Sequence, residues 1–473
     1  MQTNWIGNKR VPGGGGEIAV LNPATEELID LIPKGTKDDA DAAVSSARHA
    51  FDSWAARSPM ERRNAIRLAS EKLAGIKSEA AKLFTSEMGK PLQQAEAEIN
   101  ASIEMMRSFS ELVVHLRSGQ QMSPNGELNF QQRFPRGVAA CVVPWNFPIA
   151  VGLENVVPNL LVGNTVVWKP SEKTPLTSRL IAEKIFDHLP EGVMNVLLGD
   201  GEGVGDPLVR HPDVDVLVFV GSERTGRRLG EICGKGLKKA ILELGGKDAL
   251  IVDETVDVQA AARLAAESTY FNAGQICTST ERLFISRKIF EPFVEALVKE
   301  SLAIKVGNGL VEGVRMGPLI DHLQIEVVAG QVREAVSKGA SVLCGGNRLD
   351  GKGFFYPPTV ITGVSPDSEL MIEETFGPVA PCIPFDDFDE AIALANSTRF
   401  GLAAIVCTTS APRAMQAIHS IRAGMVKINT MRGKAPGATS EPFNSSGLGH
   451  GYGVEFLHEL TRQKSIHWKG LLS

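Results

Sequence analysis

The sequence lacks the features that mark secreted, membrane-spanning and zinc-binding proteins. No stretch approaches the roughly 18 uninterrupted apolar residues of a membrane helix, and residues 1–10 contain no apolar core of a signal peptide. The six cysteines form no Cys-x-x-Cys pair, and the nine histidines form no His-x-x-x-His motif. We therefore expect a cytoplasmic protein with reduced thiols, no membrane association and no catalytic metal.

An excess of positive charge is also missing. The 49 lysines and arginines are outnumbered by 55 aspartates and glutamates, which gives a net charge of −6, and the cations are dispersed. This balance argues against nucleic acid as a partner. With 43% hydrophobic and 22% charged residues, the composition is that of a globular protein. A chain of 473 residues is too long for one compact core, so we expect two or three structural units.

The chain does contain a long alternation of strand-like and helix-like segments. Residues 38–116 repeat apolar residues at three-to-four spacing, which predicts helices. Short apolar runs then alternate with helical patterns over 137–252 and again over 247–430. Strands are expected at Val138–Val143, Thr165–Lys169, Val193–Leu198, Val216–Val220 and Lys239–Leu244, and then at Ala249–Val252, Arg282–Ser286, Ser341–Cys344, Val379–Pro384 and Met425–Ile428. This order predicts an α/β fold with two parallel sheets.

Two further segments alternate polar and apolar residues outside this pattern. Residues 120–134 contain the pair Asn125-Gly126 between alternating arms, which predicts a β-hairpin. The C-terminal residues 460–468 also alternate, but the sequence offers them no obvious internal partner. From the residues alone they are either a strand or a frayed tail.

Cys277 stands in a setting unlike that of the other cysteines. It lies in a polar loop of small residues, Gly274-Gln-Ile-Cys277-Thr-Ser, after a helix-like apolar stretch that ends at Phe271. A thiol in such a loop can be exposed, deprotonated and directed at a substrate, whereas a thiol in an apolar core is inert. The others lie in strand-like, proline-flanked or helical surroundings: Cys141, Cys233, Cys344, Cys382 and Cys407. Cys277 is therefore the candidate nucleophile.

Two further side chains complete a set that can form and hydrolyse a thioester. Glu243 ends an apolar strand directly before the turn Gly245-Gly246, and Asn146 lies in the turn Pro144–Pro148 after another strand. An amide on such a turn can donate a hydrogen bond to an oxyanion, and a carboxylate can activate water. Each residue also has a plain alternative, since Glu243 could be a surface acid and Asn146 a turn former.

These motifs resemble those of the NAD(P)-dependent aldehyde dehydrogenases, and the resemblance covers essentially the whole chain. Six segments stand in the family's order: Pro144–Pro148, Gly163–Glu172, Phe219–Gly226, Glu243–Lys247, Gly274–Cys277 and Glu373–Pro378. The resemblance implies two Rossmann-like α/β domains with parallel sheets plus a small β flap for oligomerisation. The implied boundaries are 1–117 with 136–245 for the NAD-binding domain, 246–445 for the catalytic domain, and 118–135 with 454–473 for the flap. A homodimer or homotetramer is expected.

The resemblance implies the covalent oxidation of a small aldehyde to a carboxylic acid. Cys277 would add to the carbonyl, Asn146 and the backbone amide of Cys277 would stabilise the oxyanion, and Glu243 would activate the water that hydrolyses the thioester. Relatives that pass the thioester to coenzyme A lack a base at the position of Glu243, so a hydrolytic enzyme is expected. The alternative from a different class is a catalytically silent binding or structural protein on the same fold.

The turns that follow the first series of strands are the candidates for binding the cofactor. Gly221-Ser222-x-x-x-Gly226 opens a helix whose amides can bind phosphate, and the Gly199–Gly205 run is a weaker signal of the same kind. In the family, the residues that match Lys169 and Glu172 hydrogen-bond the adenosine ribose. A carboxylate there favours NAD over NADP, although Lys169 could accommodate a phosphate. The expected contacts are Trp145, Lys169, Glu172, Gly201, Gly221, Ser222, Gly226, Leu244, Glu374 and Phe376.

The sequence does not decide between neutral, cationic and carboxylated aldehydes. Glu154 stands where the succinate-semialdehyde members of the family have an arginine, which disfavours a carboxylated substrate. The cations of the loop after Thr430, Arg432 among them, favour one, so an NADP-preferring semialdehyde dehydrogenase is the alternative function. Phe147 and Phe443 are the expected apolar walls of the substrate pocket, with Phe443 in a shortened form of the family's C-terminal motif.

Overall fold

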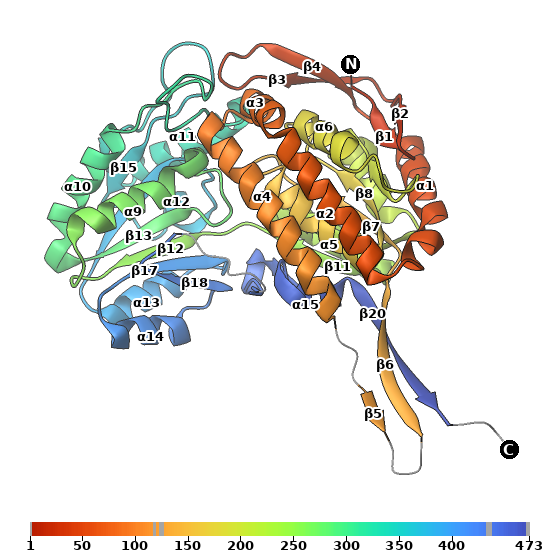
Figure 1. The fold of residues 1–473 in the computed structure, drawn as a ribbon. Coiled ribbons are helices and arrows are strands. Elements are labelled where there is room, and N and C mark those ends of the chain that lie inside the picture. Colours follow the sequence, from red (N-terminus) through yellow and green to blue (C-terminus); the bar gives the residue numbers. More distant parts are fainter. Residues whose placement is uncertain (1, 117–119, 123–126, 432–437, 470–473) are drawn as a thin grey trace.

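The computed structural model describes residues 2–116, 120–122, 127–431 and 438–469 (Figure 1). Within them, two large sheets carry helices on both faces, and two small antiparallel sheets lie at the periphery. The expected α/β architecture with two mainly parallel sheets is therefore confirmed. One of the small sheets is the hairpin of β3 (Glu17–Leu21) and β4 (Leu28–Pro33).

The first large sheet has the strand order β19-β11-β10-β7-β8-β9-β1-β2, and its five strands from β11 to β9 are parallel. Its strands are β1 (Asn4–Ile6), β2 (Lys9–Val11), β7 (Val138–Val142), β8 (Thr165–Lys169), β9 (Met194–Val196), β10 (Val214–Val220), β11 (Lys239–Glu243) and β19 (Gly447–Leu448). The helices around it are α1 (Lys37–Ala55), α2 (Pro59–Gly75), α3 (Lys77–Met88), α4 (Leu92–Leu112), α5 (Ala150–Val162), α6 (Pro175–Ile185), α7 (Asp206–Arg210), α8 (Glu223–Lys235) and α15 (Gly453–Glu459).

The second large sheet has the order β14-β15-β16-β13-β12-β17-β18, and all its pairs except β14 with β15 are parallel. Its strands are β12 (Asp248–Val252), β13 (Thr280–Ser286), β14 (Ser341–Cys344), β15 (Thr359–Thr362), β16 (Val379–Phe385), β17 (Ala403–Cys407) and β18 (Met425–Ile428). The helices are α9 (Val258–Tyr270), α10 (Phe290–Leu302), α11 (His322–Ser337), α12 (Glu369–Ile372), α13 (Phe388–Asn396) and α14 (Ala411–Ser420).

Every expected strand occurs within two residues of its predicted start and end, and the largest shifts are at the starts of β10 and β13 and at the carboxyl end of β9. Strand β15 was missed because its four residues follow Pro357-Pro358 and are too few to show a period. Strand β17 was recognised only as the strand-like surroundings of Cys407.

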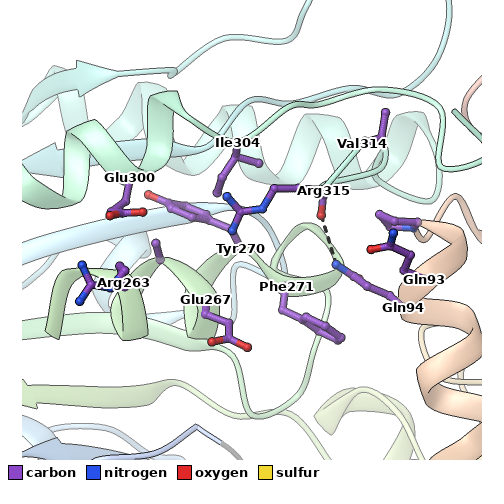
Figure 2. Close-up of a pocket in the computed structure, with 12 residues that line it drawn as sticks. Gln93, Gln94, Arg263, Glu267, Tyr270, Phe271, Glu300, Ile304, Val314 and Arg315 are labelled. Atoms are coloured by element: carbon purple, nitrogen blue, oxygen red, sulfur yellow. Dashed lines mark hydrogen bonds between the residues drawn. The ribbon is translucent and has the colours of Figure 1, made fainter. Parts of the chain in front are cut away.

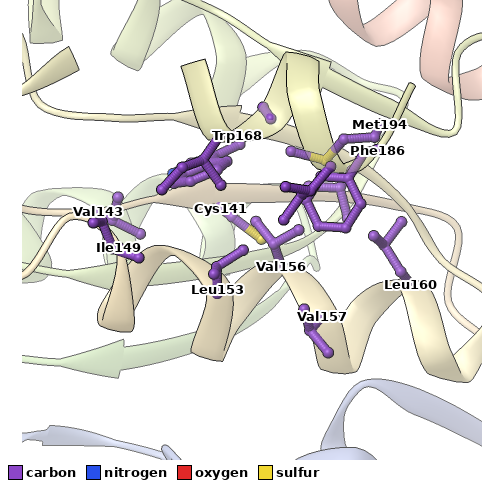
Figure 3. Packing of buried hydrophobic residues seen from close by; sticks show 14 of the residues in the cluster. Cys141, Val143, Ile149, Leu153, Val156, Val157, Leu160, Trp168, Phe186 and Met194 are labelled. Carbon is purple, nitrogen blue, oxygen red and sulfur yellow. The ribbon is translucent and has the colours of Figure 1, made fainter. Parts of the chain in front are cut away.

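The packing of α5 on the first sheet fixes the turn that precedes this helix. Leu153, Val156 and Leu160 of α5 are buried against β7 and β8 (Figure 3). A side chain at Gly152 would overlap the indole ring of Trp168, so glycine allows α5 to approach β8 closely. Because both ends of the turn between β7 and α5 are anchored in this core, Asn146 within it has a fixed position.

The C-terminal strand has a partner in its own chain, which corrects our sequence-based interpretation. Strand β20 (Thr461–Trp468) pairs antiparallel with β6 (Leu128–Pro135) along its whole length, and β5 (Gln120–Met122) pairs with the other side of β6. The three strands extend away from the body of the molecule (Figure 1). The partner lies more than 300 residues upstream, so the local pattern of 460–468 could not reveal it. The turn Asn125-Gly126 lies outside the described residues.

Candidate active site

Cys277 follows a tight turn between α9 and β13. The short helix η3 (Phe271–Gly274) closes α9, and its last three residues have left-handed φ angles of 54°, 56° and 73°. A side chain at Gly274 would overlap the backbone of Gly377, so the reversal requires glycine at this point. After the reversal the chain presents Cys277, whose side chain is half-buried.

The amide side chain of Gln275 fixes this turn. Its Nε2 donates a hydrogen bond to the carbonyl oxygen of Asn272 at 3.0 Å, and its Oε1 accepts one from the backbone N–H of Ile320 at 2.9 Å. Gln275 is completely buried, so these bonds are not exchanged with water. The half-buried thiol therefore stands on a rigid support.

Two cavities of about 240 Å³ each meet at Cys277. We name them after the molecules that the sequence predicts for each. The substrate-side cavity is lined by Phe147, Ala150, Val151, Glu154, Val220, Glu243, Ile276, Cys277, Thr278, Leu402, Gly424, Met425, Lys427, Ser440 and Pro442. The cofactor-side cavity is lined by Pro144, Trp145, Asn146, Phe147, Val151, Val220, Gly221, Ser222, Leu244, Gly245, Cys277, Gln324, Val327, Glu374 and Phe376.

The side-chain amide of Asn146 lies between the turn of Cys277 and the cofactor-side cavity. Its Nδ2 donates to the carbonyl oxygen of Gln275 at 2.9 Å, and the backbone carbonyl oxygen of Asn146 accepts from Nδ2 of Asn272 at 3.3 Å. An Nδ2 group carries two hydrogens, so this bond leaves a second donor for another acceptor. Asn146 is thus locked to the loop of the candidate nucleophile and can donate to an oxyanion formed beside it.

A buried ion pair between Lys90, which lies between α3 and α4, and Glu98 of α4 supports the same turn, and the sequence reasoning missed it. Lys90 pairs with Glu98 and donates to the carbonyl oxygen of Asn146 at 3.2 Å, while Glu98 accepts the backbone N–H of Ala150 at 3.0 Å. The ammonium group of Lys90 also lies 3.5 Å from the ring centre of Phe147. Burial lowers the pKa of Lys90 and raises the pKa of Glu98, and each charge opposes the shift of the other.

Glu243 is the last residue of β11 and lines the substrate-side cavity together with Cys277. Its backbone is held on two sides, because it is paired with Gly447 of β19 and its carbonyl oxygen accepts the N–H of Gly221 at 3.0 Å. Glu243 is half-buried at a fixed strand end, and it lines the same cavity as Cys277. The predicted pair of nucleophile and base is therefore brought together.

A third cavity, of about 440 Å³, continues from the cofactor-side cavity and shares with it Pro144, Trp145, Val220, Gly221 and Ser222. It also contains Lys169, Glu172 and Gly201, as the sequence predicted. Nζ of Lys169 lies 3.6 Å from Oε2 of Glu172, and burial lowers the pKa of this lysine. Ser222 caps α8 by accepting the N–H of Thr225 at 3.4 Å, so the start of the helix borders the cavity.

Gly226 has a packing role in this structure. A side chain there would overlap the Leu244 side chain, so the glycine lets α8 lie close to Leu244. Leu244 itself lines the cofactor-side cavity, as predicted. Sequence reasoning missed Arg224 and Arg228, two cations that line the third cavity, although both follow the Gly221-Ser222 turn directly.

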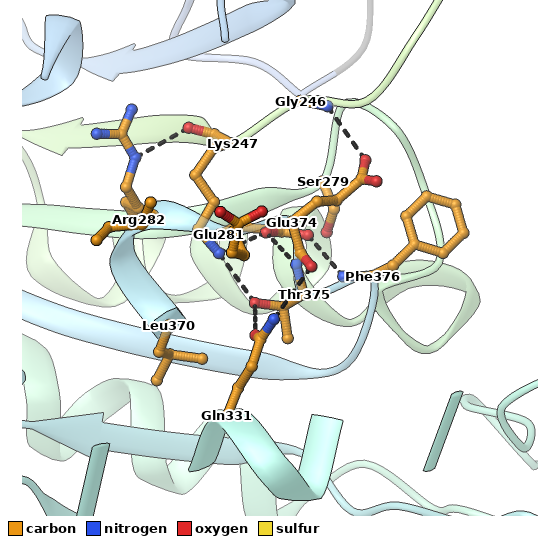
Figure 4. Close-up of polar contacts among 12 residues, drawn as sticks. Gly246, Lys247, Ser279, Glu281, Arg282, Gln331, Leu370, Glu374, Thr375 and Phe376 are labelled. Carbon is orange, nitrogen blue, oxygen red and sulfur yellow. Dashed lines mark hydrogen bonds and ion pairs between the residues drawn. The ribbon is translucent and has the colours of Figure 1, made fainter. Parts of the chain in front are cut away.

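A polar network holds the segment that carries Glu374 and Phe376 (Figure 4). Glu281 accepts the backbone N–H groups of Thr375 and Phe376, both at 2.8 Å, and pairs with Lys247 at 2.6 Å. Glu281 and Lys247 are buried, so neither charge is screened by water. Glu281 was missed, although a Glu-Arg pair inside an apolar strand is an unusual pattern that could have indicated it.

Glu374 points towards the cofactor-side cavity. Its Oε1 accepts the N–H of Gly246 at 3.1 Å. Burial, with a further contribution from the charge of Glu281, raises the pKa of Glu374 to about 8. The ring of Phe376 meets that of Trp145 edge to face, with centres 5.3 Å apart. Glu374 and Phe376, which were predicted to hold the nicotinamide ribose and ring, thus share one cavity with Trp145.

Of the candidate substrate residues, only some are found in the lining of the substrate-side cavity. Phe147 and Glu154 line the substrate-side cavity, whereas Arg432 lies outside the described residues. Where we expected Phe443, the described wall consists of Ser440 and Pro442, and the side chain of Phe443 is 45% exposed. The backbone N–H of Phe443 donates a hydrogen bond to the carbonyl oxygen of Gly401 at 2.9 Å. Lys427, on β18, is a cation of this cavity that the sequence did not single out.

A larger cavity of about 480 Å³ lies beside the end of α9, where Tyr270 and Phe271 line it (Figure 2). It is bordered by the start of α4, by α9 and by the end of α10, and a bond of 3.1 Å from Gln94 to the carbonyl oxygen of Arg315 crosses one side. Its charged residues are Arg263, Glu267, Glu300 and Arg315. It has no lining residue in common with the two cavities that meet at Cys277.

Two absences hold for the part of the chain that the structure describes. There, no three His, Cys, Asp or Glu side chains are grouped so that they could hold a metal ion. No helix among the same residues is long and apolar enough to cross a membrane.

Comparison with known proteins places the chain in a family. The model of the aldehyde dehydrogenase family matches residues 11–466, so the chain belongs to that family. An aldehyde dehydrogenase of Leishmania tarentolae, described as mitochondrial, is 37% identical over 467 residues, which cover 98% of this chain and 94% of the relative.

Two solved structures are similar over nearly their full length. Lactaldehyde dehydrogenase from Escherichia coli has a TM-score of 0.96 and 34% identity, and the match covers 99% of each chain. Betaine aldehyde dehydrogenase from Staphylococcus aureus, solved in complex with NAD+, has a TM-score of 0.96 and 30% identity, and the match covers 100% of this chain and 96% of that one. The protein is therefore an oxidoreductase of the NAD(P)-using aldehyde dehydrogenases, which convert an aldehyde to an acid.

Proposed function

We propose that this enzyme oxidises its aldehyde through a thioester on Cys277, that Glu243 is the base of the hydrolytic step, and that NAD is the preferred cofactor. One observation carries the proposal. Cys277 lines both cavities, and so stands between a space that contains Glu243 and a space that contains Asn146 and Glu374. A nucleophile must reach the aldehyde, the oxidant and the hydrolytic water in turn, and this position gives access to all three.

The proposed chemistry uses three groups of this chain in sequence. The Cys277 thiolate forms a bond to the carbonyl carbon, and the second N–H of Asn146 Nδ2 and the backbone amide of Cys277 stabilise the resulting oxyanion. When bound, the cofactor supplies the oxidation, because its nicotinamide ring accepts the hydride from the tetrahedral adduct. Glu243 then takes a proton from water as the water attacks the thioester, the carbon–sulfur bond breaks, and the thiolate is restored.

The residues present fit a dinucleotide. The cofactor-side and third cavities share five lining residues and together form one space, with Ser222 at the capped start of α8 where phosphate is favoured. Lys169 and Glu172 would hold the adenosine ribose, and Glu374 and Phe376 the nicotinamide half. The rings of Trp145 and Phe376 are nearly perpendicular to each other, which supports a binding site for a flat ring between them and Glu374.

The preference for NAD rests on Glu172, and Lys169 supports the alternative. A carboxylate accepts hydrogen bonds from both ribose hydroxyls and repels a 2′-phosphate. Lys169, 3.6 Å from Glu172, could pair with that phosphate, and an NADP-preferring semialdehyde dehydrogenase would use it in this way. We favour NAD because Lys169 is directed at a carboxylate and at the carbonyl oxygen of Pro170 at 2.9 Å.

Replacing the nucleophile tests the proposal. We expect Cys277→Ala to lower the rate of NADH formation by on the order of 10⁴-fold or more, as loss of a covalent nucleophile does. Binding of NAD, followed by calorimetry, should survive, because the thiol performs chemistry and the cofactor is held by other residues. Cys344→Ala removes another half-buried thiol and should leave both quantities unchanged. A Cys277→Ala enzyme that kept more than a few per cent of its turnover would exclude Cys277 as the nucleophile.

The proposal also covers the assembly, the domain boundaries and the cellular location of the protein. We propose a homodimer or homotetramer that uses the sheet of β5, β6 and β20 as its flap, because β20 leaves one edge of that sheet open. We retain the domain boundaries 1–117 with 136–245, 246–445, and 118–135 with 454–473. A cytoplasmic location is supported by the six free thiols, which an oxidising compartment would tend to pair. Light scattering on the purified protein tests the assembly.

A further inference from the structure

The C-terminal segment 439–453 wraps around the strand end that carries Glu243. Glu243 is paired with Gly447, and the N–H of Leu244 donates to the carbonyl oxygen of Ser446 at 2.9 Å. The hydroxyl of Ser446 donates in turn to the carbonyl oxygen of Gly245 at 2.8 Å. The backbone on either side of the candidate base is therefore bonded to this segment.

The same segment contacts the carboxylate itself at Gly451. A Cβ atom built on Gly451 would overlap Oε1 of Glu243, and the three heavy atoms nearest to it all belong to the Glu243 side chain. The φ angle of Gly451 lies outside the left-handed range, so its backbone conformation is open to any residue. What requires glycine at this position is the space occupied by the Glu243 carboxylate.

Gly451 has a defined position relative to β11. Its N–H donates to the carbonyl oxygen of Ser440 at 3.4 Å, and Nδ1 of the preceding His450 lies 2.5 Å from Oε1 of Glu459. The other oxygen of Glu459 is 2.8 Å from Nζ of Lys239, the first residue of the strand that ends at Glu243. The loop of Gly451 is thus tied to both ends of β11.

We infer that Gly451 is a positioning residue for the hydrolytic base: it leaves the space in which the Glu243 carboxylate rests at the wall of the cavity shared with Cys277. The C-terminal segment then sets the rate at which the thioester is hydrolysed, and has no part in forming it. This inference depends on the proposed role of Glu243, and the experiment below separates the failure of one from the failure of the other.

The test replaces Gly451 by alanine. Because the added methyl group meets the flexible end of a side chain, the carboxylate must move while the backbone stays in place, and the protein should fold normally. Rapid mixing with NAD and an aldehyde should give a full burst of NADH, one per active site, followed by a steady-state rate at least about tenfold below wild type, within the range that loss of general-base catalysis covers.

Two combinations show whether the effect passes through Glu243. Gly451→Ala combined with Glu243→Gln should be no slower than Glu243→Gln alone, because a displaced base and a neutral one fail at the same step. Shortening the acid with Glu243→Asp withdraws the carboxylate, so this change should cost less in the Gly451→Ala background than in wild type. Gly234→Ala is the matched control, since a Cβ there meets open space on α8.

Each outcome decides one of the two claims. If Glu243→Gln slows the steady state and Gly451→Ala leaves it at or above the wild-type rate, the positioning role is wrong while the proposed base stands. A Gly451→Ala enzyme that loses its burst, or a double variant clearly slower than Glu243→Gln, also overturns the inference, because the glycine would then act elsewhere. If Glu243→Gln itself turns over like wild type, the proposed function fails first.

Discussion

The two cavities that meet at Cys277 are built in different ways. The cofactor side is formed by strand ends and helix starts of the first sheet, and a buried Lys247–Glu281 pair holds its far wall. The substrate side is formed by α5, β18 and the C-terminal segment, and its charged residues, Glu154, Glu243 and Lys427, are all half-buried. One side is fixed by buried charges, whereas the other presents its charges to the cavity.

Because of this difference, we expect the two sides to tolerate substitutions unequally. Buried ion pairs lose much of their energy if one partner is removed, so the cofactor side tolerates little change. The half-buried charges of the substrate side can be exchanged at smaller cost, and we expect the enzyme's choice of aldehyde to depend on them. Substitutions on the two sides should therefore affect different steps of the reaction.

The largest effect is expected for Glu243→Gln, a substitution on the substrate side. If Glu243 is the hydrolytic base, the acyl-enzyme still forms and only its hydrolysis slows, by about 10²- to 10⁴-fold. Stopped-flow measurement should record an intact burst of NADH and a slow steady state. Glu154→Gln alters an acid of the same cavity and should change KM for the aldehyde without producing a burst. Loss of the burst in a folded Glu243→Gln enzyme would mean that the residue acts before the oxidation, for example on the thiol.

The two sides also differ in how much the sequence could predict. On the cofactor side, Trp145, Glu172, Gly221 and Ser222 were found because each follows a strand, and parallel strands present their carboxyl ends at one edge. The contact of Gly226 with Leu244 was not predicted, since it depends on how closely α8 approaches β11. The local sequence pattern predicts where the turn occurs, whereas the packing of α8 determines which residue Gly226 contacts.

On the substrate side the walls come from segments that are far apart in the sequence. Pro442 lines the cavity and Phe443 is 45% exposed, and the register of this shortened motif could not be fixed from the sequence alone. The contact between Gly451 and Glu243 joins positions more than 200 residues apart, and only the folded chain brings them together. The Lys90–Glu98 pair was missed for a related reason, since both residues occur in a helical stretch where charges normally face water.

A smaller effect is expected on the cofactor side from the ionisation of Glu374. With its pKa raised to about 8, this carboxyl group is neutral at pH 6.5 and becomes a carboxylate as the pH passes through 8. Because the carboxylate is the stronger acceptor for ribose hydroxyls, the affinity for NAD should rise with pH over this range, by several-fold up to about tenfold. Calorimetric titration of the Cys277→Ala enzyme between pH 6.5 and 9 measures this without turnover or a titrating thiol.

Two variants in the same background identify the group responsible. Glu374→Gln should abolish the pH dependence. Glu373→Gln removes a neighbouring carboxylate that pairs with Arg399 at 2.6 Å on the surface, and should preserve it. A pH dependence that persists in Glu374→Gln would assign the titration to another group.

A further change on the cofactor side is expected in the choice between NAD and NADP. Glu172→Ser removes the carboxylate that accepts from the ribose hydroxyls and leaves Lys169, now without its partner at 3.6 Å, free to pair with a 2′-phosphate. Hydrogen bonds to a charged group contribute about 1.5–3 kcal/mol, so the ratio of kcat/KM for NAD to that for NADP should fall by about ten- to a hundredfold. Glu202→Ser removes an exposed acid of the neighbouring η2 turn (Gly201–Gly205) that does not line the cavity, and should leave the ratio unchanged. A wild-type enzyme that already prefers NADP, or a ratio that does not move in Glu172→Ser, would show that Glu172 does not face the ribose, and the alternative cofactor would then stand.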